Sequence, residues 1–222
     1  MGIHYVLKKS FYRRYGKRAI DIVVSAAAIA VTSPINLAIA IATYRDVGSP
    51  ILFKQERLGK DGKVFTLVKF RNMTNETDEN GELLPPEMRV TKFGSLMRKT
   101  SLDELLNFWP ILKGDMSIIG PRPLLVRYGP LYNDVHRRRM EVRPGLECPT
   151  PYKVDHQLSW QERFDNDVWY VDNLSLSTDV KLLLRMVSVV FDRKQTDIRE
   201  KATRGPFIGY DENGIALEGS GD

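Results

Sequence analysis

The longest apolar segment of the chain covers residues 22–43 and contains no charged side chain. A straight helix of this length would measure about 33 Å, close to the thickness of the hydrocarbon core of a bilayer. Ser33 and Pro34 lie near its middle, where proline removes a backbone hydrogen bond and clashes with the preceding turn. We therefore expect the helix to break at Ser33-Pro34 into two halves, each too short to cross a membrane alone.

Basic residues flank this segment on both sides. They are Lys8, Lys9, Arg13, Arg14, Lys17 and Arg18 before it and Arg45, Lys54, Arg57 and Lys60 after it. Because basic flanks favour the cytoplasmic side, the pattern predicts that residues 1–46 form a re-entrant membrane hairpin. The hydroxyls of Thr32 and Ser33 are suited to bond the carbonyl groups that proline leaves without a donor. A signal peptide, a single membrane span and the buried helix of a soluble protein are the alternatives.

The pattern after residue 46 predicts one cytosolic domain over residues 47–192. Strand formers at 50–53 and 64–70, separated by Gly59-Lys60-Asp61-Gly62, predict a β-hairpin. Helical spacing recurs at 91–98, 101–109, 128–140, 159–170 and 179–192. We expect an α/β fold, mostly helical with a small sheet, whose last amphipathic helix packs on the domain or lies against lipid. Residues 193–222 form a polar tail without an assigned function.

Composition narrows the class of protein. A hydrophobic fraction of 42% and a charged fraction of 27% over 222 residues exclude a disordered chain, a collagen-like fibre and a polytopic membrane protein. The single cysteine excludes a disulfide scaffold. The formal net charge of +5 favours an anionic partner such as a phosphate, a nucleotide, a nucleic acid or an acidic membrane.

Asp103 and Glu104 are the strongest candidates for chemistry. They follow Ser101 with the spacing of a capping box, and the first turn of a helix stabilises negative charge. An ionised, fixed Asp103 would serve as a nucleophile or a metal ligand. Arg98 lies just upstream, and Arg122 lies between two prolines that stiffen the chain for bidentate phosphate binding. Together they predict a site for Mg²⁺ and a diphosphate, whereas each motif alone is more often a plain cap or turn.

A series of motifs along the chain resembles the bacterial sugar transferase family, the monotopic phosphoglycosyl transferases, in the short form that consists of the catalytic unit. In order, the motifs are Lys17-Arg18-x-x-Asp21, Ser33-Pro34, Gln55-x-Arg57-x-Gly59, Lys69-Phe70-Arg71-x-Met73, Arg98 to Leu105, Leu112 to Ser117, Gly120-Pro121-Arg122-Pro123 and Val142-Arg143-Pro144-Gly145. The resemblance covers about residues 17–191.

This resemblance implies a reaction that the residues alone do not name. Family members transfer a sugar 1-phosphate from a UDP-sugar to undecaprenyl phosphate and release UMP. By resemblance, Asp103 attacks the β-phosphate to form a covalent phosphosugar intermediate, which predicts ping-pong kinetics. Glu104 would be a metal ligand or an acid–base partner, with Mg²⁺ held by Asp103 and Glu104. Four basic residues would bind substrate phosphates: Arg98, Arg122, Lys69 and Arg71.

The same resemblance predicts a location and partners. It implies the bacterial inner membrane, with the catalytic domain facing the cytoplasm. The basic residues that accompany the membrane segment indicate contact with anionic lipid. The oligomeric state stays open, a homodimer included. Three aromatic residues are candidates for the membrane interface or, equally, for the core: Trp160, Trp169 and Tyr170.

One stretch departs from the family pattern. Family members commonly have a Gly-Trp-like stretch that ends near Asn-Gly-Arg, and residues 146–156 take its place here. Whether this loop recognises the sugar or the nucleotide base is therefore left open. Cys148 and His156 lie in this stretch, but two such residues without spaced partners favour a structural role over a metal site. The departure leaves a catalytically silent scaffold of the same fold as the alternative. A nucleic-acid binder is disfavoured, because the basic run Arg137-Arg138-Arg139 comes with no recognition motif.

Overall fold

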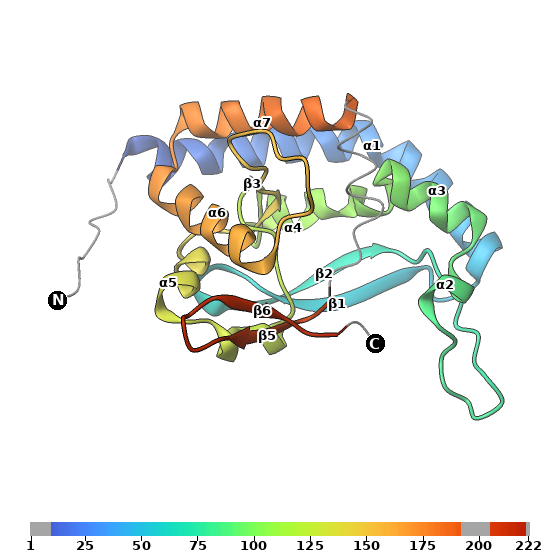
Figure 1. Cartoon of the computed structure of the whole chain (residues 1–222). Coiled ribbons are helices and arrows are strands. Elements are labelled where there is room, and N and C mark those ends of the chain that lie inside the picture. Colours follow the sequence, from blue (N-terminus) through green and yellow to red (C-terminus); the bar gives the residue numbers. More distant parts are fainter. Residues whose placement is uncertain (1–9, 192–204, 221–222) are drawn as a thin grey trace.

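The computed structural model describes residues 10–191 and 205–220. Helices predominate, and the described strands form three two-stranded sheets (Figure 1). The predicted mixed fold with a small hairpin is therefore confirmed. Residues 1–9 of the predicted membrane segment, residue 192 of the predicted domain, and residues 193–204 and 221–222 of the predicted tail lie outside the described residues.

The N-terminal segment forms one long helix instead of a broken one. A short π-helix, η1 (Tyr12–Gly16), leads directly into α1 (Lys17–Val47), which continues through Pro34. The hydroxyl of Ser33 donates to the carbonyl of Ala30 at 2.9 Å, the acceptor that Pro34 leaves without its backbone donor. In Figure 1 the helix bends but does not double back. The expected break is thus absent, because a local hydroxyl satisfies the interrupted ladder.

Helix α1 is apolar yet poorly covered. Residues Tyr12–Val47 form one helix long and apolar enough to cross a membrane, and only 11% of its most apolar stretch is buried. Val23, Val31 and Leu37 are among its exposed side chains. A buried core helix would hide this face, so that alternative does not fit, and the helix is consistent with membrane association.

Contacts near both ends attach α1 to the same globular body. The guanidinium of Arg18 donates to the carbonyls of Ile111 and Leu112 at 2.6 and 2.7 Å. One turn later, the buried carboxylate of Asp21 accepts from Ser117 Oγ at 3.0 Å and from the Ile118 amide at 3.1 Å. Towards the other end, Ile39 packs against Phe70 and Met97 in one apolar cluster.

The predicted β-hairpin is present and longer than expected. Strands β1 (Leu52–Leu58) and β2 (Val64–Phe70) pair antiparallel around the turn η2 (Lys60–Gly62). Phe65 and Leu67 on β2 pack against Ile111 and Met116 in the core. This packing fixes the inward face of β2, so that Lys69 is placed beside the segment that carries Asp103.

Short helices and one parallel strand pair fill the middle of the chain. They are α2 (Pro86–Arg89), α3 (Lys92–Thr100), η3 (Leu102–Asn107), α4 (Phe108–Lys113), β3 (Ser117–Ile119), η4 (Val126–Leu131), α5 (Asp134–Arg137), η5 (Arg138–Glu141) and β4 (Gly145–Glu147). Strands β3 and β4 pair in parallel. The helix expected over 128–140 is divided into three pieces, with Pro130 inside the first.

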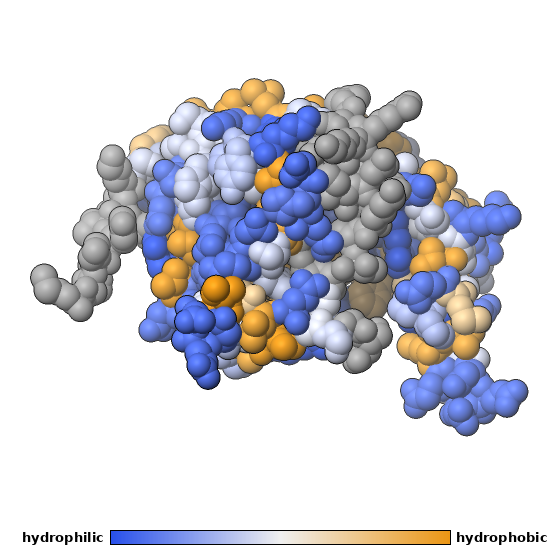
Figure 2. Space-filling model, in the orientation of Figure 1, coloured by the Kyte–Doolittle hydropathy of each residue, from blue (hydrophilic) through white to orange (hydrophobic). Residues whose placement is uncertain are grey.

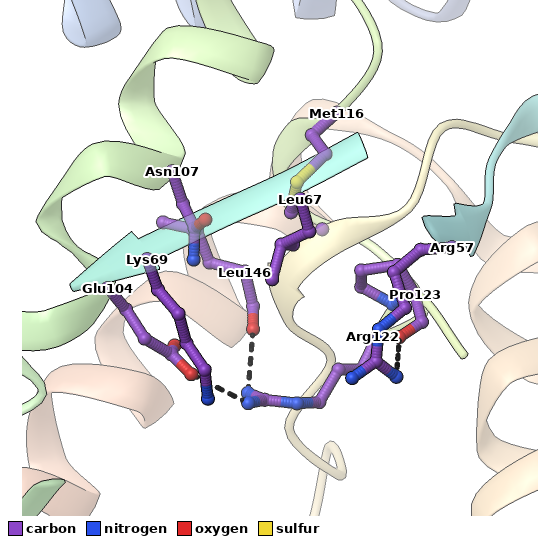
Figure 3. A pocket seen from close by; sticks show the side chains of 10 residues that line it. Arg57, Leu67, Lys69, Glu104, Asn107, Met116, Arg122, Pro123 and Leu146 are labelled. Carbon is purple, nitrogen blue, oxygen red and sulfur yellow. Dashed lines mark hydrogen bonds and ion pairs between the residues drawn. The ribbon is translucent and has the colours of Figure 1, made fainter. Parts of the chain in front are cut away.

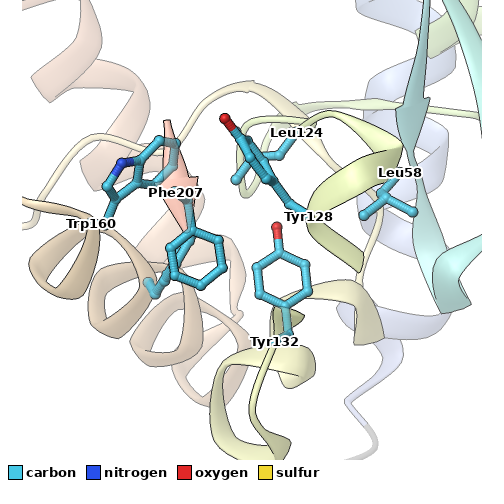
Figure 4. Close-up of a cluster of buried hydrophobic side chains, with 7 residues drawn as sticks. Leu58, Leu124, Tyr128, Tyr132, Trp160 and Phe207 are labelled. Carbon is cyan, nitrogen blue, oxygen red and sulfur yellow. The ribbon is translucent and has the colours of Figure 1, made fainter. Parts of the chain in front are cut away.

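The C-terminal segment contributes to the core. Helix α6 (Trp160–Asn173) begins with a capping box formed by Ser159 and Glu162, and Trp160 and Phe164 pack against Phe207 (Figure 4). Phe207 belongs to β5 (Phe207–Tyr210), which pairs antiparallel with β6 (Ala216–Glu218). Described residues 205–220 of the expected tail therefore form a packed hairpin. Trp160 and Tyr170 are also buried, so these two candidates for a membrane interface are core residues.

The last helix of the main body, α7 (Leu176–Phe191), lies beside α1 (Figure 1). The Asp179 carboxylate at its start accepts from Tyr12 and Tyr170 hydroxyls at 2.5 and 2.7 Å and pairs with Lys17 at 2.7 Å. Its outer face exposes Val180, Leu183, Leu184 and Val187. In Figure 2 apolar side chains gather along the edge where α7 lies.

Candidate active site

The two adjacent acids lie at the start of η3, directly after α3. Ser101 precedes them with a left-handed backbone, φ 54° and ψ 23°, and its side chain makes no cap. The expected capping box at Ser101 is therefore absent. The left-handed residue instead lets the chain turn sharply between α3 and η3, and Asp103 becomes buried, with 4% of its surface exposed.

A relay of hydrogen bonds orients the Asp103 carboxylate. Asn72 Nδ2 donates to Asp103 Oδ2 at 2.9 Å, and Arg98 Nη2 donates to Asn72 Oδ1 at 3.0 Å. Arg98, a predicted phosphate ligand, is thus near Asp103 and connected to it through an asparagine. Asn72 occupies the unspecified position of the motif Lys69-Phe70-Arg71-x-Met73. The motif assigned it no role, because that role depends on the contact between β2 and η3.

Burial changes the acidity of the groups around this carboxylate. The pKa of Asp103 is raised above its ordinary value, mainly by burial, with a smaller contribution from the negative charge of Glu104; Lys69 opposes this shift. The pKa of Lys69 is lowered by burial, against the attraction of Asp103 and Glu104. A carboxylate and an ammonium group placed together in this way are a mark of functional sites.

Beside the acids lies a small open pocket (Figure 3). Charged side chains from separate elements surround it: Arg57, Lys69, Glu104 and Arg122. Apolar side chains and one carboxamide complete the wall: Leu67, Met116, Pro123, Leu146 and Asn107. The predicted residues Lys69, Glu104 and Arg122 therefore meet in one place.

Arg122 crosses one side of this pocket. Its Nη2 donates to Glu104 Oε1 at 2.8 Å, and its Nη1 lies 3.6 Å from Glu147 Oε2. The main-chain oxygen of Arg122 accepts from the buried Arg139 at 2.9 Å. The backbone of Arg122 is thus fixed, while its guanidinium lies between two protein carboxylates.

Arg57 is a pocket residue that the site prediction did not include. Its Nη1 donates to the carbonyl of Pro123 at 3.3 Å, and its Nη2 donates to Gln55. Burial and the nearby positive charge of Arg122 lower the pKa of Arg57. Two guanidinium groups that repel each other in a half-buried pocket favour an anion between them. The Gln55-x-Arg57 motif was the feature of the sequence that could have identified Arg57 as a site residue.

Arg71 lies elsewhere. Its buried guanidinium donates to the carbonyls of Val47 and Gly48, the latter at 3.2 Å, at the C-terminal end of α1. It is not among the residues that line the pocket. A cation at a helix C-terminus stabilises the last carbonyl groups, and this contact ties α1 to β2.

The predicted Mg²⁺ ligands are Asp103 and Glu104, whose carboxylates accept from Asn72 and Arg122 in this structure. Among the described residues, no group of three or more His, Cys, Asp or Glu side chains is placed to hold a metal. Magnesium commonly uses one or two carboxylates and completes its shell with water and substrate phosphate, so Asp103 and Glu104 would hold it only together with such ligands. Cys148 is buried, and the exposed His156 pairs with Asp155 and Glu162.

Comparison with known proteins places the chain in a family. The family model described as bacterial sugar transferase matches residues 12–193. The chain belongs to the bacterial sugar transferase family. It is 46% identical over 193 residues to the uncharacterized sugar transferase EpsL of Bacillus subtilis, an alignment that covers 87% of this chain and 96% of that relative.

Longer relatives of this sugar transferase carry more specific names. The chain is 33% identical to the UDP-glucose:undecaprenyl-phosphate glucose-1-phosphate transferase of Escherichia coli, over 80% of this chain and 40% of that protein. It is 32% identical to the UDP-N-acetylgalactosamine-undecaprenyl-phosphate N-acetylgalactosaminephosphotransferase of Aeromonas hydrophila, over 78% of this chain and 43% of that protein. The chain thus spans less than half the length of these two relatives.

Proposed function

We propose that this sugar transferase moves a sugar 1-phosphate from a UDP-sugar to undecaprenyl phosphate and releases UMP. The observation that carries the proposal is the pocket where Lys69, Arg57 and Arg122 converge beside the buried carboxylate of Asp103. Cations from β1, β2 and the loop after β3 suit a diphosphate, and a carboxylate oriented by Asn72 suits attack on phosphorus. The names of the longer relatives supply the class of donor and acceptor.

In the first half-reaction, an oxygen of the Asp103 carboxylate forms a bond to the β-phosphorus of the donor. The bond between that phosphorus and the oxygen bridging to the α-phosphate breaks, and UMP leaves with the bridging oxygen and its electron pair. In the second half-reaction, an oxygen of the acceptor phosphate attacks the same phosphorus and the bond to Asp103 breaks. The carboxylate is regenerated, so the reaction balances without an added oxidant or reductant.

Charge neutralisation is the main task of the surrounding residues. Attack by one anion on another is slow, and cations at the transferring oxygens lower the repulsion. Lys69 and Arg122 are placed for this, and Arg122 exchanges its ion pair with Glu104 for one with phosphate. Mg²⁺, when held by Asp103, Glu104 and substrate oxygens, would supply further neutralisation. Released from Arg122, Glu104 would be a metal ligand or an acid–base partner.

We also propose that α1 and α7 hold the enzyme at the cytoplasmic face of the bacterial inner membrane, against anionic lipid. Arg18 near the start of α1 and Ile39 near its end contact the same globular body. A true span would separate these contacts by the thickness of a bilayer, so the fold supports an α1 that enters the membrane without crossing it. The exposed apolar faces of α1 and α7 would then lie in lipid.

The deciding experiment measures UMP release from a panel of UDP-sugars with Mg²⁺ and undecaprenyl phosphate. Wild type is compared with Asp103→Asn, which keeps the size of the side chain and removes its charge. We expect release by wild type and a loss of at least about a thousandfold in the variant, as is usual when a nucleophile is removed. Equal rates would contradict the role of Asp103. Wild type inactive on every donor would favour the silent scaffold.

A further inference from the structure

One of the predicted phosphate ligands, Arg98, binds the support of the nucleophile. It is not among the residues that line the pocket, unlike Lys69 and Arg122. Its Nη2 donates to Asn72 Oδ1 at 3.0 Å, and Asn72 Nδ2 donates to Asp103 Oδ2 at 2.9 Å. Asn72 and Asp103 are both buried, with 5% and 4% of their surface exposed. The contact that the structure gives Arg98 therefore leads to Asp103 through a buried carboxamide.

The chemistry of these three groups fixes the direction of both hydrogen bonds. A guanidinium carries only donors, so the Asn72 atom that faces Arg98 is the amide oxygen. The amide nitrogen then faces Asp103, whose ionised carboxylate only accepts. Without Arg98, the carboxamide would be free to turn over and to place its oxygen against the carboxylate. Arg98 thus determines which end of Asn72 meets the nucleophile.

The main chain of Asn72 is held as firmly as its side chain. Helix α3 lies so close to it that a Cβ atom on Gly94 would be 2.1 Å from the Asn72 carbonyl oxygen. The next residue, Met73, forms a β-bridge with Val90, just before α3. Asp103 Oδ2 is therefore bound to a fixed donor. Oδ1 accepts from no other residue in the described part of the chain, which leaves it for the bond to phosphorus.

We propose that Asn72 is a positioning residue for Asp103, and that Arg98 acts through Asn72 and not as a phosphate ligand. A misplacement of about 1 Å in a reacting group costs on the order of a hundredfold in rate. Loss of this relay should therefore slow the chemical step, while donor binding by the pocket cations stays unchanged. This inference rests on the proposed function, because it takes Asp103 as the nucleophile.

The test measures the burst of UMP release without acceptor, over a range of concentrations of the best UDP-sugar of the panel. The rate at saturation and the apparent donor affinity are thereby obtained separately. We expect Asn72→Leu and Arg98→Met each to lower the rate about ten- to a hundredfold without changing the affinity. The double variant should be no slower than Asn72→Leu, because both changes break the same relay. Two exposed residues supply matched controls that should keep the wild-type rate: Lys92→Met on α3 and Asn75→Leu.

Direct binding of phosphate by Arg98 gives a different result. Arg98→Met would then bind the donor more weakly at an unchanged saturating rate, and its effect would add to that of Asn72→Leu; either finding overturns the inference. A wild-type rate in Asn72→Leu overturns it as well. If Asn72→Leu does not fold, Arg98→Met at the exposed Arg98 decides alone, by the same separation of rate from affinity. If wild type releases no UMP from any donor, the proposed function fails and the inference falls with it, whereas an active wild type separates the two.

Discussion

At the residue scale, the burial of Asp103 lowers the stability of the folded state at neutral pH. Asp103 is 4% exposed and its carboxylate has a raised pKa, so the folded state holds this proton more tightly than the unfolded chain does. At a pH above the pKa of Asp103 in both states, ionisation stabilises the unfolded state more than the folded state, which lowers the free energy of unfolding. Packing does not explain a charge kept in such a place at neutral pH, whereas the proposed role of Asp103 as nucleophile does.

Asp103→Asn should therefore be more stable than wild type while being inactive. We expect its Tm at pH 7 to rise by a few degrees, which corresponds to about 1 kcal/mol in a chain of this size. The difference should shrink as the pH falls through the raised pKa to below about 4, where both states bind the proton. Asp78→Asn is the control: this exposed carboxylate accepts backbone N–H groups and its pKa is lowered, so its removal should not stabilise. A variant less stable than wild type at pH 7 would contradict the argument.

The sequence predicted the charged residues of the site better than the uncharged ones. Glu104 and Arg122 stand in recognisable motifs, and the structure brings them within 2.8 Å. Asn72 gains its importance only when β2 meets η3, and nothing in the local pattern distinguishes it from surface asparagines. Arg71 shows the converse. It was predicted to bind phosphate like Lys69, two positions before it, but its guanidinium lies at the C-terminal end of α1.

At the element scale, the hairpin of β5 and β6 is the part that the hydrophobic pattern did not predict. It lies beyond residues 12–193, the range matched by the family model. Phe207 is 2% exposed and stacks edge-on against Phe164 with ring centroids 5.0 Å apart. Phe207 and Tyr210 in an otherwise polar stretch give no periodic signal, whereas their packing among aromatic side chains holds the hairpin against the core.

Phe207→Ala should destabilise the protein by about 3–5 kcal/mol, the usual cost of removing a buried aromatic side chain. Its neighbour Ile208 is 54% exposed on the same strand, so Ile208→Ala should change stability by less than about 0.5 kcal/mol. Denaturant unfolding of the two variants in detergent measures the contrast. Similar small effects for both would show that the hairpin does not pack as described.

The helix α1 shows why local rules for proline were insufficient. Pro34 does remove a backbone donor, and the prediction of Ser33 as a substitute donor is confirmed by its bond to Ala30. The expected break does not follow, since the remaining ladder continues on both sides. The direction of a long helix is decided by what holds its ends, here the carbonyls of α4 bound by Arg18 and those of Val47 and Gly48 bound by Arg71.

At the scale of the whole molecule, one apolar surface and one pocket belong to a single body. The exposed apolar residues of α1 and α7 lie on neighbouring helices, which Asp179 links through Tyr12 and Lys17. The site is carried by β2 and η3, which pack below α1 through Ile39, Phe70 and Met97. A lipid-borne phosphate would thus reach a pocket held at a fixed height above the bilayer.

This arrangement predicts that both ends of α1 face the same side of the membrane. Single cysteines at exposed Arg14, before the apolar stretch, and at exposed Thr66, on β2, should react with an impermeant maleimide in inverted vesicles and be protected in intact cells. A cysteine at Val31, which is 71% exposed in the protein alone, should be protected in both preparations, because lipid covers it. The buried Cys148, whose thiol pKa is raised by burial, should give little background. Reaction of Arg14→Cys and Thr66→Cys from opposite sides would establish a true span, and one set of contacts, those of Arg18 or those of Ile39, would then have to be absent in the membrane.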